Sequence, residues 1–157
     1  MSRHLVFFYG TLKKGQPNHH FMADDMKNGR CEYVCSGQTV DKWPMVIATR
    51  YNIPCLLFKK GQGKQIYGEI YSMDTTLLNW LDFKESQVLI YKRVEIPVQL
   101  PDESIKIIWV YFIMNFKPQL LDLDNFSEYD SYGKHGLAFV GDYDPERDNY
   151  DPMSDIL

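Results

Sequence analysis

Glu85 is the residue whose type and position in this sequence best suit acid–base chemistry. A helix is predicted to begin after Asp74, an N-cap residue, and to run to about residue 82 or beyond. Its apolar stripe consists of three leucines, Leu77, Leu78 and Leu81. If the helix continues for one more turn, Glu85 joins that stripe, and burial would raise its pKa toward the range of a general base. If the helix ends at Asp82 or Phe83, Glu85 is a solvated residue beside Lys84. The spacing alone leaves both interpretations open.

A second candidate is the segment Tyr9, Gly10, Thr11 and Leu12, which follows a short apolar run. Glycine permits a sharp turn and a close approach by a ligand. Successive backbone N–H groups in such a turn can bind an anion, and Thr11 adds a hydroxyl. An ordinary structural turn explains the same four residues equally well.

The usual motifs for a protein nucleophile or a phosphate-binding loop are missing from the sequence. There is no Gly-x-Ser-x-Gly and no Walker loop. Gly61 and Gly63 lie in a polar stretch, residues 59–64, that we interpret as a hairpin turn, because Ile66 stands where a third glycine would be needed.

A metal site is not expected either. Cys31 and Cys35 are four residues apart and follow His19 and His20, but this spacing is not typical of zinc ligand pairs. On a strand the two cysteines would face the same side, as core cysteines do.

The predicted elements that would position these residues are mostly strands. Strand patterns occupy residues 5–9, 33–40, 45–47, 55–58, 65–71, 91–100 and 105–114, with a short helix expected near residues 21–26. Few helices and no alternation of strands with helices indicate an α+β fold, with a mixed or antiparallel sheet curled into a barrel.

Charge divides the chain into two parts. Residues 142–157 contain six acidic residues and one arginine, a formal charge of −5, whereas the whole chain carries −4. We therefore expect a nearly neutral domain, residues 1–141, and a solvated or partly disordered acidic tail, residues 142–157. The balance argues against a nucleic-acid-binding surface over the whole protein.

No apolar stretch is long enough for a membrane span or a secretory signal, and the three cysteines are an odd number. These features favour a cytoplasmic protein with free thiols. No heptad pattern or exposed apolar stripe is visible, so we expect a monomer.

Several motifs together resemble one family, the γ-glutamylcyclotransferase-like (AIG2-like) proteins, and most of all its γ-glutamylamine cyclotransferase branch. The most specific motif is the twelve-residue run Phe8-Tyr-Gly-Thr-Leu-Lys-Lys-Gly-Gln-Pro-Asn-His19. Shorter blocks follow in the same order: Asn52-Ile-Pro54, Leu56-Leu57, Gly68-Glu-Ile-Tyr71, Leu81-Asp82, Glu85-Ser86, Tyr91-Lys-Arg93, Tyr129-Asp-Ser131 and His135-Gly-Leu137.

The resemblance implies a small mixed β-barrel flanked by a few helices, with a cavity at one end. It also implies an enzyme that releases 5-oxoproline and a free amine from a γ-glutamyl amide by intramolecular attack of the α-amine. In the branch that the sequence resembles, the amide is γ-glutamyl-ε-lysine, the isopeptide left when transglutaminase crosslinks are degraded, and the amine is lysine. Glu85 would be the catalytic acid/base, and Tyr9, Gly10, Thr11 and Leu12 would bind the glutamyl part. No metal or cofactor is implied.

Three side chains are weaker candidates for the lining of the cavity: Tyr91, Tyr111 and Ser131. For the tyrosines, a place in the barrel core is the alternative.

The sequence is compatible with two alternative functions. Lys84 stands directly before Glu85, where the family pattern has phenylalanine, and this favours a non-catalytic binding or regulatory protein of the same fold. The other alternative is a cyclotransferase for different γ-glutamyl amides.

Overall fold

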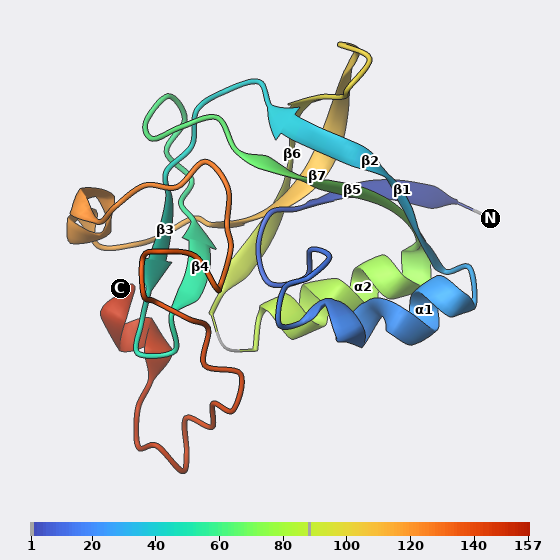
Figure 1. Cartoon of the computed structure of the whole chain (residues 1–157). Coiled ribbons are helices and arrows are strands. Elements are labelled where there is room, and N and C mark those ends of the chain that lie inside the picture. Colours follow the sequence, from blue (N-terminus) through green and yellow to red (C-terminus); the bar gives the residue numbers. More distant parts are fainter. Residues whose placement is uncertain (1, 88) are drawn as a thin grey trace.

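A closed five-stranded β-barrel forms the centre of the protein (Figure 1). The computed structural model describes residues 2–87 and 89–157. In barrel order the strands are β1 (Arg3–Phe8), β5 (Tyr67–Asp74), β2 (Cys31–Thr39), β6 (Tyr91–Gln99) and β7 (Ile105–Ile113). Neighbouring strands are antiparallel except where β1 meets β7 in parallel, with Val6 opposite Trp109. The expected α+β fold with a mixed barrel is confirmed.

Strand β1 shows how the barrel separates two cores. Because successive side chains of a strand point to opposite faces, Phe7 packs into the barrel core with Ile70, while Val6 and Phe8 pack on the helix side. These three side chains are at most 4% exposed. The second half of the strand is therefore buried on both faces, as its continuous apolar run predicts.

Helix α2 (Thr75–Glu85) covers the helix side of the barrel. The Asp74 carboxylate caps it, accepting a hydrogen bond of 2.8 Å from the backbone N–H of Leu77. Leu77, Leu78 and Leu81 are buried against β1, as the stripe predicted. The helix reaches Glu85, so the longer of the two interpretations is confirmed.

The helix expected near residues 21–26 is present as two short pieces. These are the 3-10 helix η1 (His19–Met22) and helix α1 (Ala23–Lys27). Met22 anchors them, since it is fully buried in the same helix-side core as Leu81.

A two-stranded sheet, β3 (Met45–Ala48) and β4 (Ile53–Leu56), lies beside the barrel. The expectation of a hairpin turn at residues 59–64 is wrong, because β4 pairs with β3 while β5 pairs with β1 and β2. The turn folds back on Trp43 instead: Trp43 pairs with Lys64, and Gly63, at φ +80°, approaches the Trp43 backbone too closely for any side chain.

The two cysteines of β2 do not face the same side. Cys31 is buried on the helix side, whereas Cys35 packs against the barrel core. A register shift between Tyr33 and Cys35 explains the difference, since a bulge reverses the alternation of side chains. The predicted shared face is therefore wrong.

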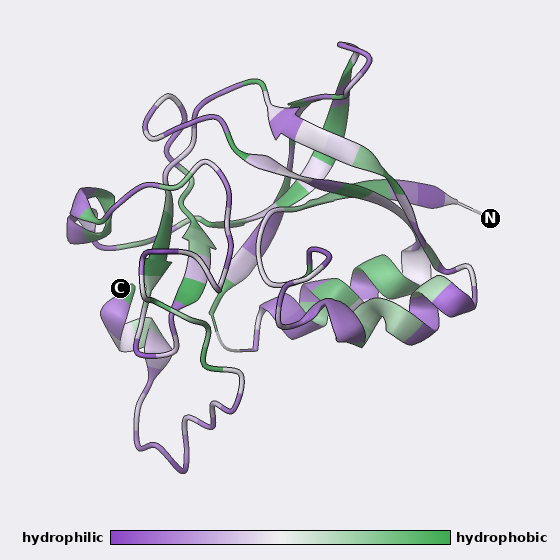
Figure 2. Cartoon of the chain, viewed as in Figure 1, coloured by the Kyte–Doolittle hydropathy of each residue, from purple (hydrophilic) through white to green (hydrophobic). Residues whose placement is uncertain are grey.

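The acidic tail is not a solvated extension. Its 3-10 helix η3 (Pro152–Asp155) and a neighbouring one, η2 (Pro118–Asp122), lie on the outer side of β3 and β4 (Figure 1). Ile156 is fully buried there and Tyr150 is 8% exposed, together with Val46 and Cys55. Figure 2 shows the reason: β3 and β4 are strongly hydrophobic, so their outer face needs a cover.

Replacing Ile156 tests this packing. We expect Ile156→Ala to lower the free energy of unfolding by about 2–4 kcal/mol, because the change leaves a cavity in a closed apolar cluster. Urea denaturation measures the effect. Leu157→Ala, at a side chain that is largely exposed, is the control and should change stability by about 0.5 kcal/mol or less. Equal effects of the two variants would contradict the packed tail.

Candidate active site

A cavity of about 240 Å³ lies where the loop after β1, the end of α2 and residues 139–143, at the start of the acidic tail, meet. Of the residues proposed from the sequence, it brings together Glu85, Tyr91, Tyr111 and the whole segment Tyr9 to Leu12. Much of the remaining lining is aromatic or aliphatic. These residues are Phe7, Phe8, Phe21, Ile53, Pro54, Trp80, Leu81, Leu89, Phe139 and Tyr143.

Glu85 supplies the carboxylate of this apolar cavity. Its side chain is partly buried, and within the described residues it has neither a hydrogen bond nor an ion pair. Loss of solvation raises the pKa of Glu85 to about 7, although the charge of Lys84 opposes the rise. A carboxyl group with this pKa can both accept and return a proton near neutral pH.

Asp82, one helical turn before Glu85, is a carboxylate in the opposite environment. Arg93 contacts it through two hydrogen bonds of 2.9 Å, and the Tyr111 hydroxyl donates a third of 2.7 Å. Although burial opposes them, these bonds hold the pKa of Asp82 below its usual value. Asp82 therefore stays ionised and anchors the end of α2 to β6 and β7, while Glu85 is left to titrate.

Hydrogen bonds within the protein hold the loop from Tyr9 to Leu12 in place. The Tyr9 hydroxyl donates to the Tyr111 carbonyl at 2.7 Å. Asn18 Nδ2 donates to Thr11 Oγ1 at 3.0 Å, and His19 Nδ1 donates to the Leu12 carbonyl at 2.8 Å. The loop is thus fixed before any ligand arrives, which lowers the cost of binding.

Gly10 permits the close packing of that loop. A β-carbon at this position would lie 3.0 Å from Cγ of Pro54. Among the described residues, the backbone N–H groups of Gly10, Thr11 and Leu12 have no hydrogen-bond acceptor. They are suited to bind a carboxylate or an oxyanion of a ligand.

Tyr91 and Tyr111 line the cavity, but their hydroxyl groups are already used. Tyr91 donates to the Pro54 carbonyl at 2.8 Å, and Tyr111 donates to Asp82. Their rings therefore shape the cavity, and their hydroxyls connect the barrel to β4 and α2.

Ser131 does not line the cavity, so its predicted role is wrong. It is 2% exposed, and its Oγ accepts a 2.8 Å hydrogen bond from the backbone N–H of Phe139. Its neighbour Tyr129 is buried in the barrel core. Ser131 thus helps to place Phe139, which does line the cavity.

Sequence reasoning missed two sets of site residues. Asp82 and Arg93 belong to two of the short motif blocks given above, and their opposite charges could have suggested an ion pair. Phe139 and Tyr143 follow the last motif and come to the cavity only through tertiary packing, for which no local signal exists.

Two further findings concern the described part of the chain. None of its helices is long and apolar enough to cross a membrane. It contains no cluster of three or more His, Cys, Asp or Glu side chains arranged to hold a metal ion.

Comparison with known proteins identifies the family. The family described as "Gamma-glutamyl cyclotransferase, AIG2-like" matches residues 6–132. The chain therefore belongs to the gamma-glutamyl cyclotransferase, AIG2-like family.

Individual relatives agree with this family. The chain is 43% identical over 145 residues to gamma-glutamylaminecyclotransferase C of Danio rerio, covering 89% of this chain and 95% of that protein. It is 38% identical over 146 residues to gamma-glutamylaminecyclotransferase of Homo sapiens, covering 86% and 95%. The crystal structure of an AIG2-like protein from Mus musculus superposes with a TM-score of 0.81 at 38% identity, covering 88% of this chain and 96% of that one.

The raised pKa of Glu85 has a consequence for stability. The folded protein binds the Glu85 proton more tightly than the unfolded chain, whose glutamates titrate near 4.5. The resulting stability is fully present below pH 4.5 and is lost as the pH rises through about 7. We therefore expect Glu85→Gln to match the wild type at pH 4 and to be more stable at pH 8, by up to about 3 kcal/mol.

Thermal and urea unfolding at the two pH values measure this difference. Glu32→Gln, which removes a negative charge at an exposed position, is the control. A Glu85→Gln variant less stable than the wild type at pH 8 would contradict a desolvated carboxylate at this position.

Proposed function

We propose that this protein is a γ-glutamylamine cyclotransferase that converts γ-glutamyl-ε-lysine into 5-oxoproline and lysine, in the degradation of transglutaminase crosslinks. The observation that carries the proposal is Glu85, a carboxyl group whose pKa burial raises to about 7, in an apolar cavity that the loop from Tyr9 to Leu12 also lines. Relatives about 40% identical over most of the chain, named gamma-glutamylaminecyclotransferases, support it.

The reaction needs a base but no protein nucleophile. The α-amine of the substrate is largely protonated in water near neutral pH and must lose a proton before it can attack. Glu85 accepts this proton, and the amine nitrogen then forms a bond to the γ-carbonyl carbon, closing a five-membered ring. The bond from that carbon to the leaving nitrogen breaks as Glu85 returns the proton to the departing amine. The ring nitrogen, which still carries two hydrogens, then releases its second proton to solvent, and the free lysine amine takes up a proton to become an ammonium group. Atoms and charge balance without a cofactor.

The rest of the cavity orients the two reacting groups. We assign the N–H groups of Gly10, Thr11 and Leu12 to the substrate α-carboxylate or to the developing oxyanion. Because amine and carbonyl belong to one molecule, holding it in the folded-back conformation supplies much of the rate. The apolar lining keeps water away from Glu85 and so maintains its pKa.

The non-catalytic alternative rested on Lys84 and is not favoured. The Lys84 side chain is exposed at the edge of the cavity, with its ammonium 5.7 Å from the centre of the Trp80 ring. Its charge lowers the pKa of Glu85 but does not cancel the larger effect of burial. A lysine here therefore tunes the base and does not disable it.

Turnover rates on a small panel of γ-glutamyl amides would determine which amide the enzyme prefers. We expect γ-glutamyl-ε-lysine to be the preferred substrate, and we expect the enzyme to act as a monomer in the cytoplasm. Light scattering tests the monomer.

Glu85→Gln tests the central role. The variant keeps the shape of the side chain but cannot transfer a proton, so kcat should fall by about 10²- to 10⁴-fold. Release of 5-oxoproline and lysine from γ-glutamyl-ε-lysine is the measurement. Asp24→Asn, an exposed site on α1 away from the cavity, is the control. Turnover by Glu85→Gln at the wild-type rate would overturn the assignment.

The pH profile tests the environment of Glu85. Because the base must be ionised, kcat/KM should rise with pH and level off above about pH 7. Lys84→Ala removes a charge that lowers this pKa, so the rising limb should move to higher pH. Lys84→Arg retains the charge and should leave the limb in place. A shift to lower pH in Lys84→Ala would contradict the described environment.

A further inference from the structure

Tyr143 brings the acidic tail into the cavity. It lies beyond residues 6–132, the part that matches the family, and lines the same cavity as Glu85. Burial raises the pKa of its phenol, and the charge of Glu85 adds to the rise, so the two side chains are close enough to interact.

Two aromatic contacts hold the Tyr143 ring. The Tyr51 ring lies 5.0 Å from it, centre to centre, and the Phe139 ring meets it edge-on at 6.1 Å. Tyr51 also fixes the preceding segment, because its carbonyl accepts a 2.9 Å hydrogen bond from the Val140 N–H. Asn52 Nδ2 donates to the Ala138 carbonyl at 2.9 Å. The segment from Ala138 to Tyr143 is thus attached to the turn between β3 and β4.

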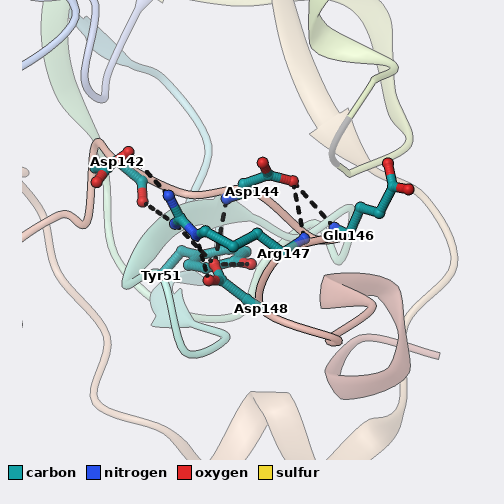
Figure 3. Close-up of polar contacts among 6 residues, drawn as sticks. All are labelled: Tyr51, Asp142, Asp144, Glu146, Arg147 and Asp148. Carbon is teal, nitrogen blue, oxygen red and sulfur yellow. Dashed lines mark hydrogen bonds and ion pairs between the residues drawn. The ribbon is translucent and has the colours of Figure 1, made fainter.

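A polar cluster closes the loop behind Tyr143, and we name it the Arg147 clasp: Tyr51, Asp142, Arg147 and Asp148 (Figure 3). Arg147 donates to the Asp142 carbonyl at 2.8 Å and to Asp148 Oδ1 at 3.0 Å. Asp148 Oδ2 accepts from the Tyr51 hydroxyl at 2.9 Å. The clasp therefore joins Asp142 and Asp148, which lie on either side of Tyr143 in the sequence, to Tyr51, whose ring contacts the Tyr143 ring.

The position of Tyr143 relative to the reaction follows from the chemistry of Glu85. Glu85 must reach two nitrogen atoms, the α-amine and the leaving nitrogen, which are bonded on different sides of the glutamyl chain. The loop from Tyr9 to Leu12 is assigned to the glutamyl part. The leaving amine then extends from Glu85 along another wall of the cavity, and Phe139 and Tyr143 form such a wall on a separate segment.

We propose that Tyr143 is a specificity-determining residue whose ring contacts the aliphatic stem of the leaving amine, and that Arg147 is a positioning residue that holds this ring in place. The inference rests on the proposed cyclotransferase function and adds the subsite for the amine. The tail thus selects amides of long alkyl amines over those of small ones.

Two substrates separate this role from general damage. The probes are γ-glutamyl-ε-lysine and γ-glutamyl-methylamide, which share the glutamyl part and differ in the amine. Tyr143→Ala should lower kcat/KM for the lysine substrate about tenfold, mainly through KM, since the contact covers about two methylene groups. For the methylamide the change should be about twofold or less. Tyr143→Phe keeps the ring and should stay within about twofold for both.

Arg147 acts on the substrate only through the clasp. Its replacement should therefore raise KM for the lysine substrate, as Tyr143→Ala does, but by less. Arg147→Ala should raise KM for the lysine substrate about threefold, since exposed ion pairs are individually weak, and Arg147→Lys should recover part of the loss. Glu146→Ala is the matched control, because Figure 3 shows its carboxylate pointing away from the clasp. Tyr132→Ala, a largely exposed tyrosine outside the cavity, is the control for Tyr143.

Each outcome decides the proposal. A Tyr143→Ala variant whose losses are equal for both substrates, or absent, overturns the amine subsite, and so does a Tyr143→Phe variant as impaired as Tyr143→Ala. An unchanged KM for Arg147→Ala overturns the positioning role. In these cases the wild type still releases 5-oxoproline, so the proposed function stands. A wild type without turnover on either substrate overturns both.

Discussion

The removal of one carboxylate from water is the constraint on which the site depends. Glu85 is the last residue of α2, and the leucine stripe that buries the helix brings it to the apolar cavity. Keeping a carboxylate there without a charged partner costs stability, and that cost appears as a pKa of about 7. The cost is tolerated because the barrel and helix cores are extensive, and it produces a group that can transfer protons at neutral pH.

Asp82 shows that the environment, not the residue type, separates the two carboxylates. It lies on the same helix, three residues earlier, yet Arg93 and Tyr111 satisfy it and keep it ionised. These hydrogen bonds fix the end of α2 against the barrel and so hold Glu85 in place relative to the loop after β1. A divided pair of this kind, one anchored and one titrating, is a common basis for acid–base assignments in enzymes.

Much of the fold could be predicted from local pattern. The alternating and continuous apolar runs indicated the barrel strands, and the Asp74 cap and leucine stripe indicated α2. Whether α2 reached Glu85 could not be decided, because one more turn changes few local interactions. The hairpin at residues 59–64 and the shared face of Cys31 and Cys35 were wrong, since pairing partners and bulges depend on distant strands. The prediction for the tail was wrong because net charge reflects only its exposed residues. Tyr150 and Ile156 are buried because they pack against the apolar outer face of β3 and β4.

The pKa of the Glu85 carboxyl group is the central quantity, and it can be measured directly. Carbon-13 NMR of the glutamate side-chain carboxyl carbons, followed from pH 3 to pH 9 and assigned by the Glu85→Gln spectrum, gives the titration of this one group. The account predicts a midpoint near pH 7 for Glu85 in the ligand-free protein. A midpoint near pH 4.5, the value of a solvated glutamate, would contradict it.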